Sequence, residues 1–263
     1  MEYKDQLGRL LQFSTTPTRI VSLVPSLTEL LVDLGLRDHI MGLTKFCVHP
    51  NGLIKEKIIV GGTKQVHIDR VKALQPDIIL CNKEENTEQI VDDLEAIAPV
   101  HISDIKNIED TLSLIRMYGA IFQIQDKAHR LVDKIQKKHR DFSKGLDASV
   151  PCKKVAYFIW KDPWMVAGND TFIDYLLGEC GYENVFKTKE GRYPEVSLDQ
   201  LQEVDYIFLS SEPFPFAEKH IQELMLHTRA KIMLVDGEYF SWYGSRLLGA
   251  FDYFKILQKQ LKL

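Results

Sequence analysis

Along this chain, hydrophobic and polar residues follow each other with the period of a helix in some segments and of a strand in others. One block of this pattern occurs twice. HIDRVKALQPDIIL begins at residue 67, and VSLDQLQEVDYIFL begins at residue 196. Each block predicts a short amphipathic helix, with Asp69 or Asp199 in its first turn, and then a buried strand. A polar loop, a second helix and another strand follow each block in the same order. The repeat therefore predicts two related α/β lobes.

The repeat extends upstream of each block as a further strand and helix. In the first half, RIVSLVPSLTELLVDLG predicts a strand and then a helix. Ser26 and Glu29 have the spacing of a capping box at the start of this helix, and Gly35 is expected to end it. These local signals place a βα unit at the beginning of the first lobe.

The second half has the corresponding strand in KKVAYFIW and the corresponding helix in NDTFIDYLLGECG. We expect Asn169 or Asp170 to cap this helix and Gly181 to end it. Ser197 and Gln200 form another capping-box pair, ahead of the helix that carries Asp199.

Between the two halves, residues 107–146 contain no proline, and Gly119 is the only glycine before Gly145. Apolar residues recur there at an approximately helical period, which predicts one continuous helix of about 35 residues. A break near Gly119 would give two helices instead. We expect an N-terminal lobe over 1–106, a connecting helix over 107–146 and a C-terminal lobe over 147–263. The predicted fold is α/β, with two Rossmann-like lobes of mainly parallel strands joined by one long helix.

Composition excludes several function classes. The 263 residues carry a net charge of −4, which provides no basic surface for nucleic acid. No apolar run reaches the length of a transmembrane helix. The first twenty residues lack the features of a secretory signal, so the sequence as given is expected to be cytoplasmic. Four widely spaced cysteines predict no disulfide framework.

Loops after the carboxyl ends of parallel strands are the expected ligand site of such lobes. The second lobe is rich in aromatic residues there, and flat rings suit a corrin, a porphyrin or an aromatic chelator. The same rings could instead form a core between the lobes. The candidate ligand-binding residues are Pro25, Ser26, Phe46, Thr63, Asn82, Trp160, Trp164, Tyr193, Glu238, Trp242 and Arg246.

A direct metal site is a second hypothesis. Cys47 and His49 in an extended loop would point to one side, and His67 could join them as a third ligand. Thiolate and imidazole groups suit zinc, cobalt or iron. Scattered cysteine and histidine residues are more often structural, and this spacing matches no established metal motif.

Enzyme motifs are absent from the chain. It has no dinucleotide-binding GxGxxG after the first strand, no P-loop, no GxSxG and no HExxH. We therefore expect a binding protein with no catalytic residues and no intrinsic cofactor.

Five segments together resemble the cobalamin- and iron-chelate-binding proteins of ABC importers, whose lobes are joined by a single long helix. They occur in that family's order and spacing. The segments are RIVSLVPSLTELL, KFCVHP, VGGTKQVHIDRVKALQPDIIL, AGNDTFIDYLLGECGYENVF and RYPEVSLDQL.

The resemblance implies a receptor that captures a metal chelate in the cleft between its lobes. The expected ligand is a cobalamin-like corrinoid, haem or a ferric siderophore. Thr63 and Asn82 stand where cobalamin binders carry tryptophan, whereas a carboxylate is retained as Glu238. The ligand is therefore left open among these three classes.

The resemblance also implies partners and a location. Asp69 and Asp199 match the acidic residues with which the family docks on an ABC transporter permease. A monomer in the periplasm or cell envelope is expected.

Tetrapyrrole chelatases have a comparable outline. Such an enzyme needs a histidine and a carboxylate that face each other, and His67 and Glu238 could provide them. A chelatase therefore stays open as a third hypothesis.

Overall fold

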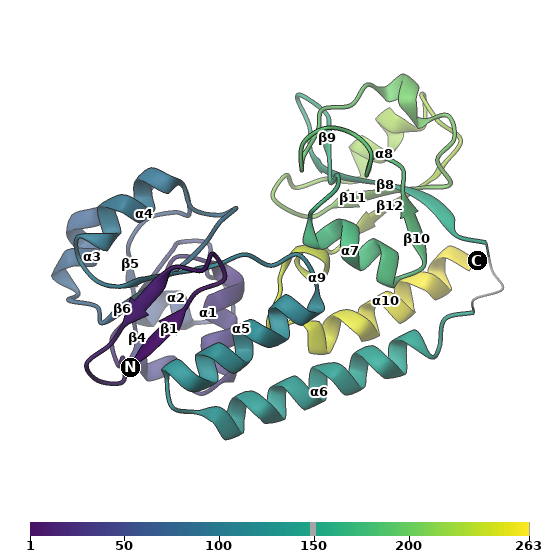
Figure 1. Ribbon diagram of the computed structural model, residues 1–263. Helices are drawn as coiled ribbons and strands as arrows, with labels where there is room; N and C mark the ends of the chain where they lie inside the picture. Colours follow the sequence, from purple (N-terminus) through teal and green to yellow (C-terminus); the bar gives the residue numbers. More distant parts are fainter. Residues whose placement is uncertain (148–150, 263) are drawn as a thin grey trace. The chain divides into compact units, whose positions relative to one another are not determined.

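The computed structural model describes residues 1–147 and 151–262 (Figure 1). The chain divides into two compact units. Unit 1 comprises Met1–Gln136 together with Tyr243–Leu248. Unit 2 comprises Lys137–Trp242 together with Gly249–Leu263. The chain therefore passes between the units within the helix α6 (Gln125–Ser143) and again on either side of the short segment 243–248.

Unit 1 is built on a five-stranded parallel sheet with the order β5-β4-β3-β6-β7. Its strands are β3 (Ile20–Ser22), β4 (Ile40–Leu43), β5 (Ile58–Ile59), β6 (Ile78–Asn82) and β7 (Val100–Ser103). Its helices are α1 (Pro25–Asp33), η1 (Arg37–His39), α2 (Leu53–Glu56), α3 (Ile68–Ala73), α4 (Glu88–Glu95) and α5 (Ile108–Ile121). An antiparallel hairpin, β1 (Glu2–Lys4) with β2 (Leu10–Gln12), precedes them. The strand order reverses at β3 and β6, as in a doubly wound sheet.

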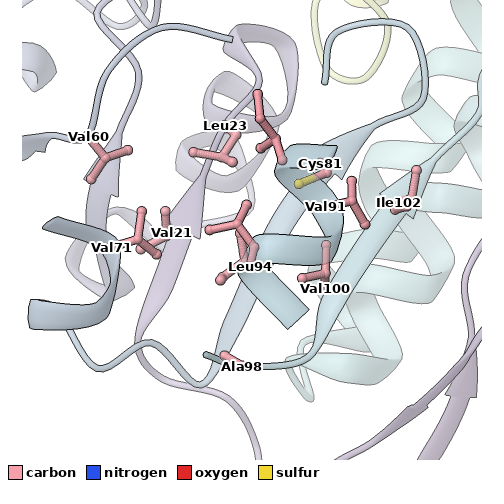
Figure 2. Packing of buried hydrophobic residues seen from close by; sticks show 12 residues of the cluster. Val21, Leu23, Val60, Val71, Cys81, Val91, Leu94, Ala98, Val100 and Ile102 are labelled. Atoms are coloured by element: carbon pink, nitrogen blue, oxygen red, sulfur yellow. The ribbon is translucent and has the colours of Figure 1, made fainter. Parts of the chain in front are cut away.

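The core of unit 1 explains why its strands are continuous apolar runs. Val21, Cys81 and Val100 project from three neighbouring strands into one cluster, and Val71 and Leu94 enter it from helices α3 and α4 (Figure 2). A parallel sheet covered on both faces by helices buries both sides of each strand. The alternation expected of a half-exposed strand is therefore missing here.

Unit 2 has the parallel order β10-β8-β11-β12, with β9 antiparallel to β8 at one side. Its strands are β8 (Lys153–Trp160), β9 (Met165–Val166), β10 (Tyr182–Asn184), β11 (Tyr206–Ser210) and β12 (Lys231–Val235). Its helices are α7 (Phe172–Glu179), η2 (Leu198–Leu201), α8 (Glu218–Leu224), α9 (Glu238–Ser241) and α10 (Leu247–Lys262), the last of which begins in unit 1. The mainly parallel α/β fold expected for both lobes is confirmed.

The repeated aspartates Asp77 and Asp205 accept equivalent backbone hydrogen bonds in the two units. Asp77 precedes β6 and accepts hydrogen bonds from the backbone N–H groups of Thr18 (2.8 Å) and Arg19 (2.9 Å), at the start of β3. Asp205 precedes β11 and accepts one from the N–H of Lys154 (2.8 Å), near the start of β8. Each carboxylate thus ties the amino ends of the two central strands together.

The continuous helix expected over 107–146 is wrong in extent. Helix α5 ends at Ile121, Gln123 adopts a left-handed φ of 54°, and α6 begins at Gln125. Gly119 shows why the chain turns here, since a Cβ on Gly119 would lie 2.6 Å from the Cβ of Ala128. The absent side chain lets α6 pack closely on α5 once the chain has turned at Gln123. The expected start of the second lobe adjoins residues 148–150, which lie outside the described residues.

Two of the expected helix caps are also wrong. Ser26 and Glu29 form no capping box, because α1 begins at Pro25 after Val24 and has no side-chain cap. Helix α7 is capped by Thr171, whose Oγ1 accepts from the N–H of Asp174 (3.0 Å), and not by Asn169 or Asp170. The pair Ser197 and Gln200 does form a capping box. Gly35 and Gly181 follow their helices at φ values of 79° and 78°, as expected of terminating glycines.

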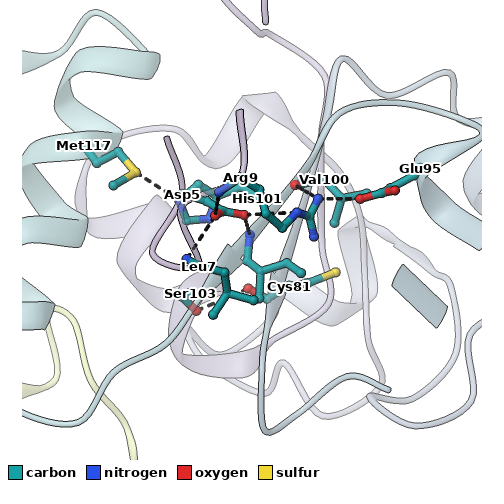
Figure 3. A network of polar contacts seen from close by, with 10 residues as sticks. Asp5, Leu7, Arg9, Cys81, Glu95, Val100, His101, Ser103 and Met117 are labelled. Carbon is teal, nitrogen blue, oxygen red and sulfur yellow. Dashed lines mark hydrogen bonds and ion pairs between the residues drawn. The ribbon is translucent and has the colours of Figure 1, made fainter. Parts of the chain in front are cut away.

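The hairpin β1–β2 was not expected from the sequence, and it covers the outer edge of β7 (Figure 3). Asp5 in the hairpin turn accepts hydrogen bonds from the N–H groups of Leu7 (3.0 Å), Arg9 (2.9 Å) and Ile102 (3.2 Å). The Arg9 guanidinium donates to the Val100 carbonyl (3.0 Å). The buried Asp5 carboxylate therefore satisfies backbone groups of both the turn and the sheet edge.

Candidate functional site

The strand ends of unit 1 carry a network of small polar side chains. Asn82, the last residue of β6, is buried and donates to the carbonyl oxygen (3.0 Å) and Oγ (3.1 Å) of Ser103 at the end of β7. Its side-chain oxygen accepts from the N–H groups of Glu84 (2.8 Å) and Glu85 (3.2 Å). Asn82 is thus occupied in shaping the 83–86 loop, and its side chain is not presented to a ligand.

The same loop is joined to the segment that contains Thr63. Asn86 accepts from the N–H of Asn82 (2.9 Å) and donates to the carbonyl of Thr63 (2.9 Å). A Cβ on Gly62 would lie 3.1 Å from the ring of Phe46, so the Phe46 loop borders this segment too. The predicted residues Phe46, Thr63 and Asn82 therefore come from three neighbouring loops. Phe46 is the most exposed of the three, at 48%, whereas Thr63 is half-buried and Asn82 is buried.

Tyr243 links the segment 243–248 to the strand ends of unit 1. Its hydroxyl lies 3.1 Å from Ser103 Oγ and also hydrogen-bonds with Ser26. The ring is buried, and burial raises the pKa of the phenol. Ser26 is therefore part of a packed hydrogen-bond network at the first turn of α1, next to the buried Pro25.

Arg246 forms a bidentate ion pair with Glu29 of α1. Its Nε and Nη2 donate to the two carboxylate oxygens, each at 2.8 Å. Burial raises the pKa of Glu29, while the Arg246 hydrogen bonds and charge oppose that shift. Bidentate guanidinium–carboxylate pairs are geometrically specific, so this pair holds segment 243–248 on helix α1. The expected role of Arg246 as a ligand contact must compete with it.

Unit 2 has an aromatic cluster at the carboxyl ends of β8 and β11, made of Trp160, Trp164, Phe214 and Phe216. Trp160 ends β8, is 41% exposed and meets Phe214 edge to face, with ring centroids 5.6 Å apart. Trp164 stacks on Phe216 at 6.0 Å, and Lys161 lies over its ring at 5.3 Å. The half-buried Trp164 and Phe214 leave part of their rings open to solvent. This cluster exposes parts of several aromatic rings, inclined to one another, at the strand ends of unit 2.

Trp242, by contrast, is directed into unit 2. It is 7% exposed, and its indole N–H donates to Glu212 (2.9 Å). Glu212 also accepts from Ser241 Oγ (2.6 Å), and burial raises the pKa of Glu212. The nearby Glu238 is half-buried, and its N–H donates to Asp236 (3.1 Å). Trp242 therefore supports the loop after β11 and exposes little surface for binding.

Tyr193 lies in a loop that is held against β9. The backbone N–H of Val166 donates to the carbonyl of Pro194 (3.1 Å), and the N–H of Val196 donates to the carbonyl of Trp164 (2.9 Å). Tyr193 itself is half-buried. The loop that carries it is therefore fixed next to the aromatic cluster.

The proposed metal ligands are not brought together. Cys47 is fully buried, and its sulfur lies within hydrogen-bond distance of Thr28 (3.1 Å) and Thr44 (3.3 Å). Burial raises the pKa of this thiol, which disfavours the thiolate that a metal needs. His67 is exposed just before α3. Over residues 1–147 and 151–262, no three histidine, cysteine, aspartate or glutamate side chains are grouped to hold a metal ion.

Asp69 and Asp199 are both exposed, each in the first turn of a short helix. Neither forms an ion pair within its own unit across the described part of the chain. An open hollow of about 550 Å³ also exists in unit 1, lined by Arg9–Gln12, Glu95 and Ile97–Val100. It lies beside the hairpin, at the amino end of β7, and contains none of the predicted ligand-binding residues.

Sequence reasoning missed three residues of these strand-end sets, namely Ser103, Phe214 and Phe216. Ser103 ends β7, so the rule that selected Asn82 would also have selected it. The two phenylalanines lie in a proline-rich loop after β11, where their clustering with Trp160 depends on the parallel pairing of β8 with β11. That pairing is a tertiary fact which the local pattern does not contain.

Comparison with known proteins places the chain in a family. The family model described as periplasmic binding protein matches residues 20–231, which includes both sheets. The chain belongs to the periplasmic binding protein family. The resemblance stated from the five sequence segments is thereby confirmed.

Individual relatives of this periplasmic binding protein are distant. The vitamin B12-binding protein of Yersinia pestis (strain Pestoides F) is 25% identical over 184 residues, which are 70% of this chain and 65% of that protein. The chain thus spans slightly less than two thirds of that relative. Among solved structures, a periplasmic heme-binding protein from Pseudomonas aeruginosa superposes with a TM-score of 0.79 at 24% identity, covering 92% of each chain. The periplasmic vitamin B12-binding protein of Vibrio cholerae gives 0.75 at 21% identity, covering 93% of this chain and 99% of the other.

These superpositions confirm the two-lobed α/β fold. The family is one of periplasmic binding proteins, and no enzyme is among the relatives named above. Within the described residues, no helix has both the length and the apolar character needed to cross a membrane.

Proposed function

We propose that this periplasmic binding protein captures a metal chelate of the corrinoid, haem or ferric-siderophore class and delivers it to an ABC-type permease. The supporting observation is the exposed aromatic cluster at the strand ends of unit 2, in a family whose relatives include a vitamin B12-binding protein. Corrin and porphyrin rings are planar and largely apolar at their faces, and Trp160 offers a ring of the same character. Capture requires no bond chemistry.

Among the three ligand classes, the site favours a planar macrocycle. The strand ends of unit 2 expose Trp160 and parts of Trp164 and Phe214, and Lys161 beside Trp164 could pair with a peripheral carboxylate. Lys161 already lies near Glu223 (3.3 Å) and Asp162 (3.5 Å), so such a pairing would be an exchange between partners. Haem carries propionates at its edge, which suits this arrangement.

Docking on the permease is assigned to Asp69 and Asp199. Both carboxylates are exposed, and they occupy equivalent positions of the repeat. A partner with two related halves could therefore pair a basic group with each one. In this proposal the protein carries the bound ligand to the permease and releases it there.

Binding of purified protein to hemin, cyanocobalamin, a ferric hydroxamate and free Zn²⁺ or Co²⁺ tests this proposal. A ligand at 100 times its Kd should raise the free energy of unfolding by about 2.7 kcal/mol. Binding should also quench tryptophan fluorescence, and Trp160→Ala should reduce that quenching. Binding of the free cations alone, or catalytic insertion of metal into protoporphyrin, would overturn the proposal. So would a failure of every chelate to bind.

A further inference from the structure

The outer strands β7 and β12 occupy equivalent places in the two sheets. Asn82 at the end of β6 is paired with Ser103, and Ser210 at the end of β11 is paired with Val235. Counting back from these pairs, Val100 corresponds to Ile232, and Ile102 corresponds to Leu234. The free edges of the two sheets can therefore be compared residue by residue.

Hydrogen bonds identify which backbone groups face outward. The N–H of Lys231 donates to the carbonyl of Asp205 (3.0 Å), and the N–H of Ser211 donates to the carbonyl of Val235 (3.0 Å). Residues 231, 233 and 235 therefore direct their backbone groups to β11. Because successive residues of a strand point these groups to opposite sides, Ile232 and Leu234 direct theirs away from the sheet.

In unit 1 the corresponding outward groups are satisfied by the hairpin. The Ile102 N–H donates to Asp5 (3.2 Å), and the Val100 carbonyl accepts from Arg9 (3.0 Å). One step further along, the N–H of Asp104 donates to the side-chain oxygen of Gln6 (3.2 Å). Figure 3 shows Asp5 and Arg9 reaching this edge from the hairpin. Unit 1 thus covers its outer strand with its own chain.

Unit 2 offers no such cover among the residues that the structure describes. No hydrogen bond to the backbone of Ile232 or Leu234 is found there beyond the sheet itself. The Leu234 side chain is 43% exposed, and Ile232 and Met233 are only half-buried. An apolar edge strand with unpaired N–H and C=O groups is a template for another strand.

We propose that β12 pairs antiparallel with β12 of a second copy of this chain, which joins two units 2 into one continuous sheet. A two-fold axis requires the antiparallel direction, because each copy must present the same surface to the other. With the axis at Met233, each Ile232 lies opposite the partner copy's Leu234. These residues carry the outward groups, so each pair exchanges two N–H···O=C bonds.

The charges at the two ends of β12 also favour antiparallel pairing with a second copy of the chain. Arg229 and Lys231 lie at the start of β12, whereas Asp236 and Glu238 follow its end. Antiparallel pairing brings the basic end of one copy beside the acidic end of the other. A parallel arrangement would instead place like charges together, which is unfavourable.

The pairing surface is small, so we expect a weak, reversible dimer in place of the monomer expected from the sequence. An interface of one five-residue strand per copy lies at the low end of specific interfaces, where association is transient. The dimer would therefore form at high local concentration. It does not depend on the ligand or on the permease.

Sedimentation equilibrium from about 5 to 500 µM, a range suited to a weak transient interface, tests the proposal directly. We expect the mass to rise from monomer toward dimer, with weaker association at high salt. Leu234→Pro removes an outward N–H without disturbing the β11 ladder, and it should weaken the dimer at least about tenfold. Leu234→Lys provides a second variant with a charged edge, in case the proline variant does not fold. Leu226→Lys is the matched control, because Leu226 is 83% exposed but lies outside the strand, and it should not change association.

Hydrogen exchange gives an independent readout. The amides of Ile232 and Leu234 should become slower to exchange as the concentration rises, while the Met233 amide, already in the ladder, should not. A protein that remains monomeric throughout the range overturns the proposal. So does a dimer that persists in both Leu234 variants, or protection of the Ile232 and Leu234 amides in the monomer.

Discussion

Unit 1 covers the outer strand of its sheet with a hairpin and fills its strand ends with small polar side chains, whereas unit 2 leaves β12 open and gathers aromatic rings at its strand ends. The common frame is nevertheless close. Asp77 and Asp205 hold the amino ends of the central strands in the same way. The difference teaches that the repeat preserves the groups which connect neighbouring strands, while the edges and the carboxyl-end loops have diverged.

Two tryptophans test this division between frame and surface, and they carry the largest expected effect. Trp242→Ala should lower the free energy of unfolding by about 3 kcal/mol, because it empties a buried site and removes one of the two side-chain donors to Glu212. Trp160→Ala should change stability by less than about 1 kcal/mol but weaken chelate binding by at least about that amount. Urea unfolding and fluorescence titration separate the two quantities. If Trp242→Ala and Trp160→Ala lowered the stability equally, Trp242 could not be distinguished from Trp160 as the structural residue.

His101 in β7 and Met233 in β12 occupy equivalent positions, and the comparison predicts a pH effect at this strand position in unit 1 that the equivalent position of unit 2 lacks. Burial lowers the pKa of His101 from 6.5 to about 4. Below pH 6.5 the unfolded chain therefore binds a proton that the folded chain does not, so stability falls as the pH decreases from 6.5 toward 4. The full difference corresponds to about 3 kcal/mol.

His101→Met, which copies unit 2, should remove most of the acid dependence that comes from His101, because it places an apolar side chain without a titrating group beside Met117. Chemical denaturation at pH 7, 6, 5 and 4 measures it. At pH 7 the variant and the parent should have similar pH slopes. If the stability of the variant still fell in the same way between pH 6.5 and 4, titrating groups other than His101 would be responsible for the acid dependence.

The paired aspartates provide a smaller and more symmetrical test. Asp77→Ala and Asp205→Ala should each lower stability by about 1 kcal/mol, because each removes an acceptor for backbone N–H groups. Asparagine at either position keeps an acceptor oxygen and is the matched control. Hydrogen bonding to the Lys154 N–H lowers the pKa of Asp205, so its contribution is present above the unfolded pKa and is lost as the pH falls through the lowered value. A large effect at only one position would show that the repeat no longer shares this function.

The smallest effect on stability is expected at Asp69 and Asp199. Reversing both to lysine should change the free energy of unfolding by less than about 0.5 kcal/mol, since exposed charges contribute little. Ligand affinity should also be retained. Uptake or permease binding should be lost if these residues dock the protein, and Asp126→Lys, at another exposed aspartate, is the control. Normal transport by the double variant would leave the docking proposal without support.

Much of the fold was predictable because parallel strands and short helices leave local signals. Apolar runs bounded by polar turns located β3, β6, β8 and β11, and Gly35 and Gly181 marked the ends of two helices. The candidate site was predictable only as a set of loops, since the carboxyl ends of parallel strands meet at one edge of a sheet. Phe46 lies in such a loop and Trp160 ends β8, and both side chains are exposed there, while their contact with a ligand stays a prediction.

The errors share one physical cause, which is that local signals were outweighed by contacts distant in sequence. Glu29 has the spacing of a capping-box residue, but it pairs with Arg246, 217 positions away. Trp242 looked like a ligand contact because it lies in an aromatic loop, but Glu212 provides a buried acceptor for its indole. The cluster expected from Cys47 was lost because two threonines surround its sulfur.

By itself, the sequence determined which segments form helices and strands, the block that occurs twice, and the α/β class of each lobe. These features depend on periodicity and turn chemistry within short segments. Tertiary structure decided where the helix of residues 107–146 breaks, since the contact of Gly119 with Ala128 exists only after α6 folds back on α5. It also decided which edge is covered. The hairpin that satisfies β7 lies about ninety residues upstream, and only folding brings the Asp5 carboxylate to the Ile102 amide while the edge of β12 stays open.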